Sequence, residues 1–153
     1  MDDTRDLIEA KAFEQSGQEY SLSGGRLRLI LTNPSIRACV LFHLCATPGI
    51  FRVMYRNALI WLHSCDVSIG ADIQGPIYLP HPLNIVIGQG ATVESGVTIY
   101  QGVTLGAGRG GMYPTIREGA TIYTNSVIVG AAEIPPGVRI RACSLISNSH
   151  DAT

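Results

Sequence analysis

The sequence predicts a mainly β protein whose main domain is a parallel β-helix, and three observations predict it. Aliphatic residues recur every six positions, glycine supplies 17 of the 153 residues, and only 15% of residues are charged. A period of six matches neither the 3.6-residue turn of a helix nor the two-residue repeat of a strand. It fits a short strand followed by a corner, and three such units close a triangular coil of about 18 residues.

The positions expected to point into the coils hold only aliphatic side chains. The register slips twice, by two residues between Leu79 and Ile87 and by five between Leu105 and Ile116. Most of these positions are followed four residues later by a small or β-branched residue that can fill a corner. Stacked coils bury such side chains against their neighbours. The thirteen positions are Val67, Ile73, Leu79, Ile87, Val93, Ile99, Leu105, Ile116, Ile122, Ile128, Ile134, Ile140 and Ile146.

Two helices are expected before the coils. Asn33 can cap a helix that has Pro34 in its first turn and runs over Ser35–Thr47. Pro48-Gly49 ends this pattern, because neither residue favours a helix interior. Apolar residues then recur over Ile50–His63, which predicts a second helix.

The composition changes near residue 65, which sets the expected domain boundary. Residues 1–65 hold 13 of the 23 charged residues but only 4 of the 17 glycines. We therefore expect an N-terminal helical segment over 1–65, the β-helix over 66–147, and a polar tail over 148–153.

Charge and cysteine usage exclude several classes of function. A net charge of −1 offers no basic field for nucleic acid. The longest uncharged stretch near the N-terminus, 38–51, is shorter than the roughly 20 residues of a membrane-spanning helix. Neither a secretory signal nor clustered Cys and His ligands for zinc appear in the sequence. The four cysteines are expected to be reduced thiols of a cytoplasmic protein.

The repeat resembles that of the hexapeptide-repeat acyltransferases, which form left-handed parallel β-helices and assemble as trimers. Within that superfamily, residues from about Cys65 to Ser147 are most similar to the serine acetyltransferases. The narrowest similarities are the context of His81, the VTLG run at 103–106 and the PTIREG run at 114–119. The resemblance implies an acetyl-CoA-dependent O-acyltransferase that requires no metal.

The resemblance makes His81 the general base and Asp66 the residue that orients it. A neutral imidazole has a pKa near 6.5, which suits proton abstraction close to neutral pH. A carboxylate on the other ring nitrogen would set the tautomer and stabilise the imidazolium. The two residues are 15 positions apart, close to one coil, so they can meet on adjacent coils.

The resemblance also predicts a coenzyme A groove between subunits of a homotrimer. The second register slip, from Gly106 to Thr115, is expected to be an extruded loop that closes the neighbouring subunit's site. Gly106 and Ala107 at its root and Thr124 in a later coil match cofactor-binding positions. Arg139 matches a basic residue near the cofactor's phosphates, and a guanidinium suits phosphate oxygens.

Two departures from the family concern the amino-acid pocket. Serine acetyltransferases carry an aspartate before the catalytic histidine and an Arg-His pair before the PxIREG run. This chain has Pro80 and Met112-Tyr113 there. These departures favour a hydroxyl other than that of serine, and we expect a sugar or polysaccharide precursor as the acceptor. Aromatic side chains could stack on a sugar ring, and the candidates are Tyr78, Tyr100 and Tyr113.

Other interpretations remain open at this point. The chain could be a serine O-acetyltransferase with an altered pocket, or a non-catalytic β-helix that serves as a scaffold. A β-helix carbonic anhydrase is less favoured, because His43, His63 and His150 lie outside the repeat core.

Overall fold

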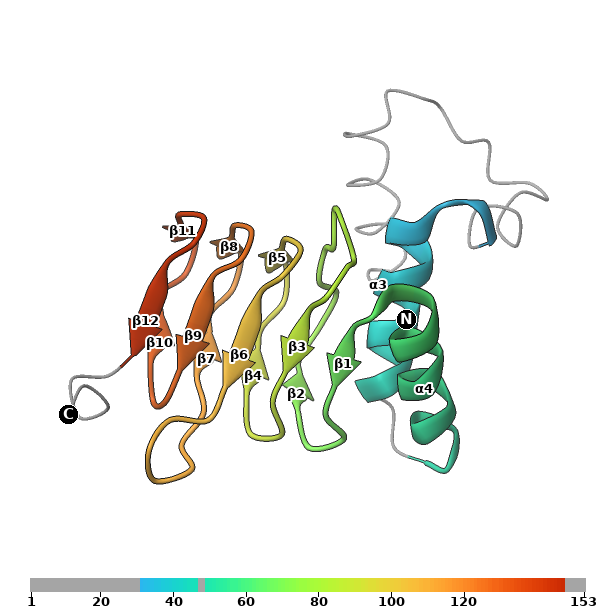
Figure 1. The fold of residues 1–153 in the computed structure, drawn as a ribbon, viewed down its shortest axis with the longest axis horizontal. Coiled ribbons are helices and arrows are strands. Elements are labelled where there is room, and N and C mark those ends of the chain that lie inside the picture. The colour runs from blue at the N-terminus through green and yellow to red at the C-terminus, as the bar shows by residue number, and fades with distance from the viewer. Residues whose placement is uncertain (1–30, 47–48, 148–153) are drawn as a thin grey trace.

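The computed structural model describes residues 31–46 and 49–147, and consists of two helices followed by a β-helix (Figure 1). The helices are α3 (Pro34–Ala46) and α4 (Phe51–His63). The first strand begins at Asp66 and the last ends at Ser147. The N-terminal part of the predicted helical segment, 1–30, and the predicted tail, 148–153, lie outside the described residues.

Short parallel strands form three sheets, which we call faces A, B and C, and the chain visits them in that order in each coil. Each strand pairs with the equivalent strand of the next coil, as in Asp66 with Val86. Face A contains β1 (Asp66–Val67), β3 (Val86–Ile87), β6 (Thr104–Gly106), β9 (Val127–Val129) and β12 (Leu145–Ser147). Face B contains β2 (Asp72–Ile73), β4 (Thr92–Val93), β7 (Thr115–Ile116) and β10 (Glu133–Ile134). Face C contains β5 (Thr98–Ile99), β8 (Thr121–Ile122) and β11 (Arg139–Ile140). The predicted parallel β-helix is therefore confirmed.

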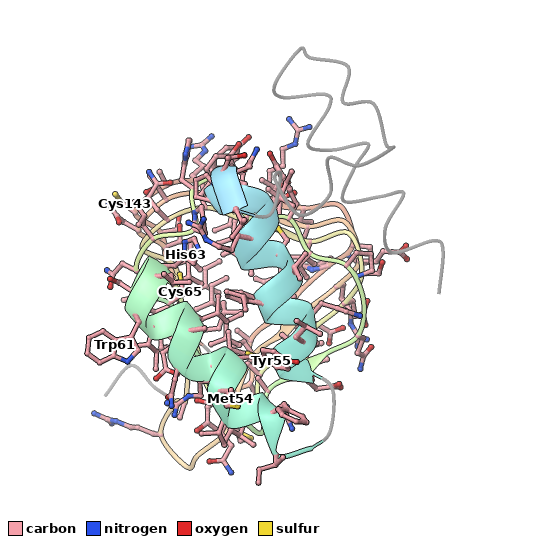
Figure 2. The ribbon with its side chains drawn as sticks, turned by 90° about the vertical axis from the view of Figure 1, so that its right-hand side faces the viewer. Met54, Tyr55, Trp61, His63, Cys65 and Cys143 are labelled. Atoms are coloured by element: carbon pink, nitrogen blue, oxygen red, sulfur yellow. The ribbon has the colours of Figure 1, made fainter. Side chains whose placement is uncertain are left out.

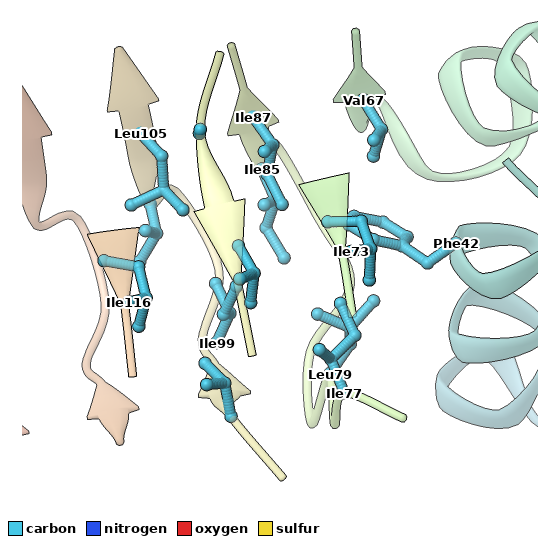
Figure 3. Packing of buried hydrophobic residues seen from close by; sticks show 14 of the residues in the cluster. Phe42, Val67, Ile73, Ile77, Leu79, Ile85, Ile87, Ile99, Leu105 and Ile116 are labelled. Carbon is cyan, nitrogen blue, oxygen red and sulfur yellow. The ribbon is translucent and has the colours of Figure 1, made fainter. Parts of the chain in front are cut away.

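The inside of the coils is filled by the aliphatic residues that the six-residue period predicts. The central members, such as Ile99, Leu105 and Ile116, have no exposed surface (Figure 3). Ile140 and Ile146 are partly buried, because they lie in the last described coil. Burial of an isoleucine or leucine side chain contributes roughly 1.5–3 kcal/mol, so these positions supply most of the stabilisation of the coils.

The two helices cover the N-terminal end of the β-helix. Phe42 of α3 is fully buried and points toward Ile73 of the first coil (Figure 3). The predicted cap of α3 is present, because the Ile36 N–H donates to Asn33 Oδ1 at 3.2 Å. The helices and the coils therefore share one hydrophobic core.

The outer face of α4 is apolar and exposed. Leu59 is buried, whereas Met54 and Trp61 of the helix, and Ile50 just before it, are exposed. Figure 2 shows Met54 and Trp61 on the outer side of α4. The apolar residues that predict this helix therefore lie on both its buried and its exposed faces. Among the described residues, no helix is both long enough and apolar enough to cross a membrane.

Candidate active site

His81 lies at the corner between faces C and A of the first coil, where the chain is longer than in the next coil. Tyr78 bridges to Thr98 of the next coil, and the Leu83 carbonyl accepts a hydrogen bond from the Gly102 N–H. This register leaves His81 and Pro82 without equivalents in that coil, so they are the two residues of the first predicted slip. Because the coil cannot absorb them, the segment leading into β3 rises beyond the neighbouring corners (Figure 1).

The His81 side chain is exposed although both of its neighbours are buried. Pro80 and Pro82 pack inward, and the His81 imidazole points away from the core. Its ring centroid is 6.2 Å from that of Tyr100, which occupies the same corner of the next coil. An exposed imidazole beside an aromatic ring is open to a substrate hydroxyl, as a general base must be.

Asp66 begins β1, and its carboxylate is bound by Arg56 of α4. Arg56 Nε donates to Oδ1 at 2.7 Å, and its terminal nitrogen donates to Oδ2 at 2.9 Å. The hydrogen bonds to Asp66 raise the pKa of Arg56, so the guanidinium stays charged. Within the described residues, no hydrogen bond joins Asp66 to His81. Arg56 therefore holds the Asp66 carboxylate, although no pattern in the sequence relates these two residues.

The three tyrosines predicted to contact an acceptor have different surroundings. Tyr100 is half-buried beside His81 and stacks on Tyr123 of the next coil, with ring centroids 5.0 Å apart. Tyr78 belongs to the buried core, so its ring is not available to stack on a ligand, and this expectation is corrected. Tyr123 was not singled out from the sequence, although it occupies the position of Tyr100 one coil later.

Tyr113 lies at the corner between faces A and B, over two glycines. A Cβ placed on Gly88 would be 2.5 Å from Tyr113 Cε1, and one on Gly90 would be 2.5 Å from Cδ2. The ring therefore packs on backbone that has no side chains. Gly90 has no positive φ, so the packing of the Tyr113 ring, and not the backbone conformation, explains why glycine is needed at this corner.

The loop that contains Tyr113 is the second predicted slip, and it extends from the β-helix between β6 and β7 (Figure 1). It is closed by hydrogen bonds from the Gly108 N–H to the Met112 carbonyl at 2.9 Å and from the Gly111 N–H to the Gly108 carbonyl at 3.1 Å. Gly106 ends β6 at the root of this loop, and Ala107 beside it is exposed.

The remaining predicted cofactor residues lie near face C. Thr124 is at the same corner as His81, two coils further along, and its hydroxyl donates to the Gln101 carbonyl at 3.0 Å. Arg139 is exposed on the outer side of β11. One chain therefore places His81, Thr124 and Arg139 along one side of the β-helix, and Gly106, Ala107 and Tyr113 at a different corner.

No metal centre is formed in the part of the chain that the structure describes, since no three His, Cys, Asp or Glu side chains gather there. His63, His43 and His81 lie on α4, on α3 and at a coil corner, respectively. No zinc site of the carbonic anhydrase kind is thus assembled by the described residues of one chain.

The chain is similar in sequence to serine acetyltransferases. It is 35% identical over 97 residues to the serine acetyltransferase of Escherichia coli K12, an alignment that covers 61% of this chain and 36% of that protein. It is 39% identical over 88 residues to the serine acetyltransferase of Buchnera aphidicola from Acyrthosiphon pisum, covering 54% and 32%. The chain thus spans about a third of the length of the curated relatives that it matches. No family model matches it.

A solved structure of a serine acetyltransferase in complex with CoA has a similar fold. The TM-score is 0.67 at 25% sequence identity, and the alignment covers 92% of this chain and 59% of that structure. The resemblance to hexapeptide-repeat acyltransferases, and within them to serine acetyltransferases, is therefore confirmed.

These findings overturn the expectation of a non-serine acceptor. Sequence relatives and structural neighbours alike are serine acetyltransferases, so a sugar or polysaccharide acceptor is not supported. That expectation was inferred from two local departures, Pro80 and Met112-Tyr113. Two local departures do not outweigh a similarity that extends over 97 residues.

Proposed function

We propose that this chain is an acetyl-CoA-dependent serine O-acetyltransferase with His81 as its general base. The observation that carries the proposal is the similarity to serine acetyltransferases across the coils that place His81 at an exposed, lengthened corner. Acetyl-CoA is the proposed co-substrate because the similar serine acetyltransferase structure is a complex with CoA.

In the proposed reaction, the neutral His81 imidazole removes the proton from the serine hydroxyl as its oxygen attacks the thioester carbon of acetyl-CoA. The tetrahedral intermediate expels the thiolate of coenzyme A, and the imidazolium returns the proton to that sulfur. The products are O-acetylserine and coenzyme A, so every atom is accounted for. An imidazole can both accept and donate a proton, so one side chain serves both proton transfers.

Asp66 is proposed to orient His81 while Arg56 holds the carboxylate. A bidentate guanidinium fixes both carboxylate oxygens in a plane and leaves each with a further lone pair that can accept an imidazole N–H. Arg56 would then be a support for Asp66, in contact with neither substrate.

Coenzyme A is proposed to lie in a groove between two subunits of a homotrimer. The described residues fit such a groove only when two copies contribute, because His81, Thr124 and Arg139 lie away from the corner of Gly106 and Ala107. Arg139 is exposed and can pair with a phosphate, and Ala107 leaves its backbone open to a ligand. Tyr100, beside His81, and Tyr113, in the loop, are the proposed aromatic contacts of the bound substrates.

A cytoplasmic location is part of the proposal. None of the four cysteines forms a disulfide, which is usual for a reducing compartment; they are Cys39, Cys45, Cys65 and Cys143.

The test uses purified chain, acetyl-CoA and L-serine, with release of coenzyme A and formation of O-acetylserine both measured. We expect turnover with wild type and its loss in His81→Ala. The matched control is His43→Ala, which removes an exposed histidine from α3 and should keep full activity. Absence of O-acetylserine with the folded wild-type chain would contradict the proposed reaction.

The subunit arrangement is tested by light scattering on the same sample. A homotrimer has about three times the 16.4 kDa mass of the chain. A stable monomer that nevertheless turns over serine would contradict a site between subunits.

A further inference from the structure

The His81 corner has a coil on only one side. Toward the C-terminus it contacts the next coil, where the Gly102 N–H donates to the Leu83 carbonyl at 3.0 Å. On the other side lie α3 and α4 instead of a coil. The position of His81 therefore depends on how these helices contact the segment that runs from Leu79 to Asn84.

Ser35, in the first turn of α3, holds the chain immediately before His81. Its hydroxyl lies 2.6 Å from the Leu79 carbonyl oxygen and 2.7 Å from the Pro80 carbonyl oxygen. A hydroxyl has one proton, so the two carbonyls share it. The Pro80 carbonyl belongs to the peptide bond that joins Pro80 to His81, so this contact is made at the backbone directly before the proposed base.

His63, the last residue of α4, holds the chain immediately after His81. Its ring is buried, and its Nε2 accepts a hydrogen bond from Arg37 Nε at 3.2 Å. The proton of the neutral ring is therefore on Nδ1. The Pro82 backbone, which has no N–H and can only accept, forms a hydrogen bond with the ring. The His63 carbonyl in turn accepts the Asn84 N–H at 3.3 Å.

Arg37 completes the arrangement from α3. One of its terminal nitrogens donates to the Leu31 carbonyl at 2.9 Å, which orients the guanidinium while Nε reaches His63. The two helices thus bind the peptide groups on both sides of His81, and the adjoining prolines restrict the backbone between them.

We propose that Ser35, Arg37 and His63 are positioning residues that hold His81 in its reactive place, and we call them the helix clamp. This inference rests on the proposed function, because it assigns a role relative to the His81 base. The clamp touches no substrate: it acts through the backbone of residues 79–84. A displacement of about 1 Å in a reacting group can cost about 100-fold in rate, so loosening this backbone should lower kcat.

The first experiment compares Ser35→Ala with Ser35→Thr. Removal of the hydroxyl should lower kcat about 10-fold with little change in the KM for acetyl-CoA, and threonine should restore activity because it keeps the hydroxyl. Ser68→Ala, at the corner between faces A and B of the same coil, is the matched control and should leave kcat unchanged. Unchanged kcat in Ser35→Ala would overturn the clamp, as would a fall in thermal stability with normal activity per folded molecule.

The second experiment does not depend on activity. Amide hydrogen exchange is measured over residues 79–86 in wild type, Ser35→Ala, His63→Asn and His63→Phe. Exchange of this segment should accelerate at least about 10-fold in Ser35→Ala and His63→Phe, while strands of the later coils stay protected. His63→Asn, which retains a donor near the position of Nδ1, should fall between wild type and His63→Phe. Equal exchange in all four proteins would overturn the clamp.

The two experiments separate failure of the clamp from failure of the proposed function. A folded wild-type chain without serine acetyltransferase activity would refute the function, and exchange would still show whether the helices hold the segment. An active wild type whose Ser35→Ala variant shows normal kcat and normal exchange would refute the clamp alone.

Discussion

The packing of Tyr113 on Gly90 predicts a strong energetic coupling between the loop and the second coil. The perturbation is Gly90→Ala. All three nearest atoms to a Cβ at this position belong to the Tyr113 ring, at 2.5, 3.0 and 3.1 Å. Ordinary carbon contacts need about 3.5–4.0 Å, so the ring would have to move by about 1 Å.

The magnitude follows from two opposing effects. Overpacking against a ring costs about 1–3 kcal/mol of unfolding free energy. Without the ring, Gly→Ala at a site whose φ suits alanine stabilises a protein by about 0.4–1 kcal/mol, because it restricts the unfolded chain. We therefore expect Gly90→Ala to destabilise wild type but to stabilise the Tyr113→Ala protein. The effect on the unfolded chain is common to both backgrounds and cancels, so the coupling energy is the overpacking cost of about 1–3 kcal/mol.

The assay is urea unfolding of wild type, both single variants and the double variant, at one protein concentration. Tyr113→Phe is the matched control, because it keeps the ring and should therefore keep the cost of Gly90→Ala. An equal change in unfolding free energy on Gly90→Ala with and without the Tyr113 ring would show that the ring and Gly90 are not coupled.

Three other predictions concern the core, the ion pair and the buried histidine. Ile99→Ala removes three carbon atoms from a fully buried site and should lower the unfolding free energy by about 2–5 kcal/mol, whereas Ile69→Ala, at a residue 46% exposed, should lower it by under about 1 kcal/mol. Similar losses for the two variants in urea unfolding would contradict the inward orientation of Ile99. Asp66→Asn breaks an ion pair in which the side chains of Asp66 and Arg56 are 39% and 31% exposed, so it should lower the unfolding free energy by at most about 1 kcal/mol. It should nevertheless lower kcat at least about 10-fold, and a normal kcat would show that Asp66 has no part in the mechanism. Burial and the nearby Arg37 charge lower the pKa of His63, so the stability that its neutral form supplies should be present above about pH 6.5 and lost as the pH falls below that value. A His63→Asn protein as pH-dependent as wild type, or a His43→Ala control that loses the dependence, would contradict this assignment.

Much of the fold can be predicted from the sequence because the repeat is local. The six-residue period identifies Ile99 and Ile122 as inward-facing, and their burial follows from the closure of each coil. The two-residue slip locates the exposed His81 corner for the same reason, since extra residues in a regular coil must bulge outward. Tyr123 was missed, although the period relates it directly to Tyr100 and could have identified it.

Other parts of the candidate site have no such signal. His63 lies outside the repeat, so the period gives it no role, yet its ring contacts the chain beside His81. Ser35 is separated by more than 40 residues from the carbonyls that it binds. Tyr78 and Tyr100 are the same residue type, so the sequence predicts the same role for both, but the position of Tyr78 in the core makes it unsuitable for stacking on a ligand.

The six-residue pattern is enough to predict the β-helix, its core and the corner at which His81 is exposed, because a fixed period relates each coil to the next. How that corner is held follows only from the packing of the folded chain. The hydrogen bonds of Ser35 and His63 and the pairing of Arg56 with Asp66 join helices to coils. The six-residue repeat does not extend into the helices, so these contacts depend on how α3 and α4 pack on the end of the β-helix. That docking is set by shape and burial around Phe42 and Leu59, and it exists only once the whole chain has folded.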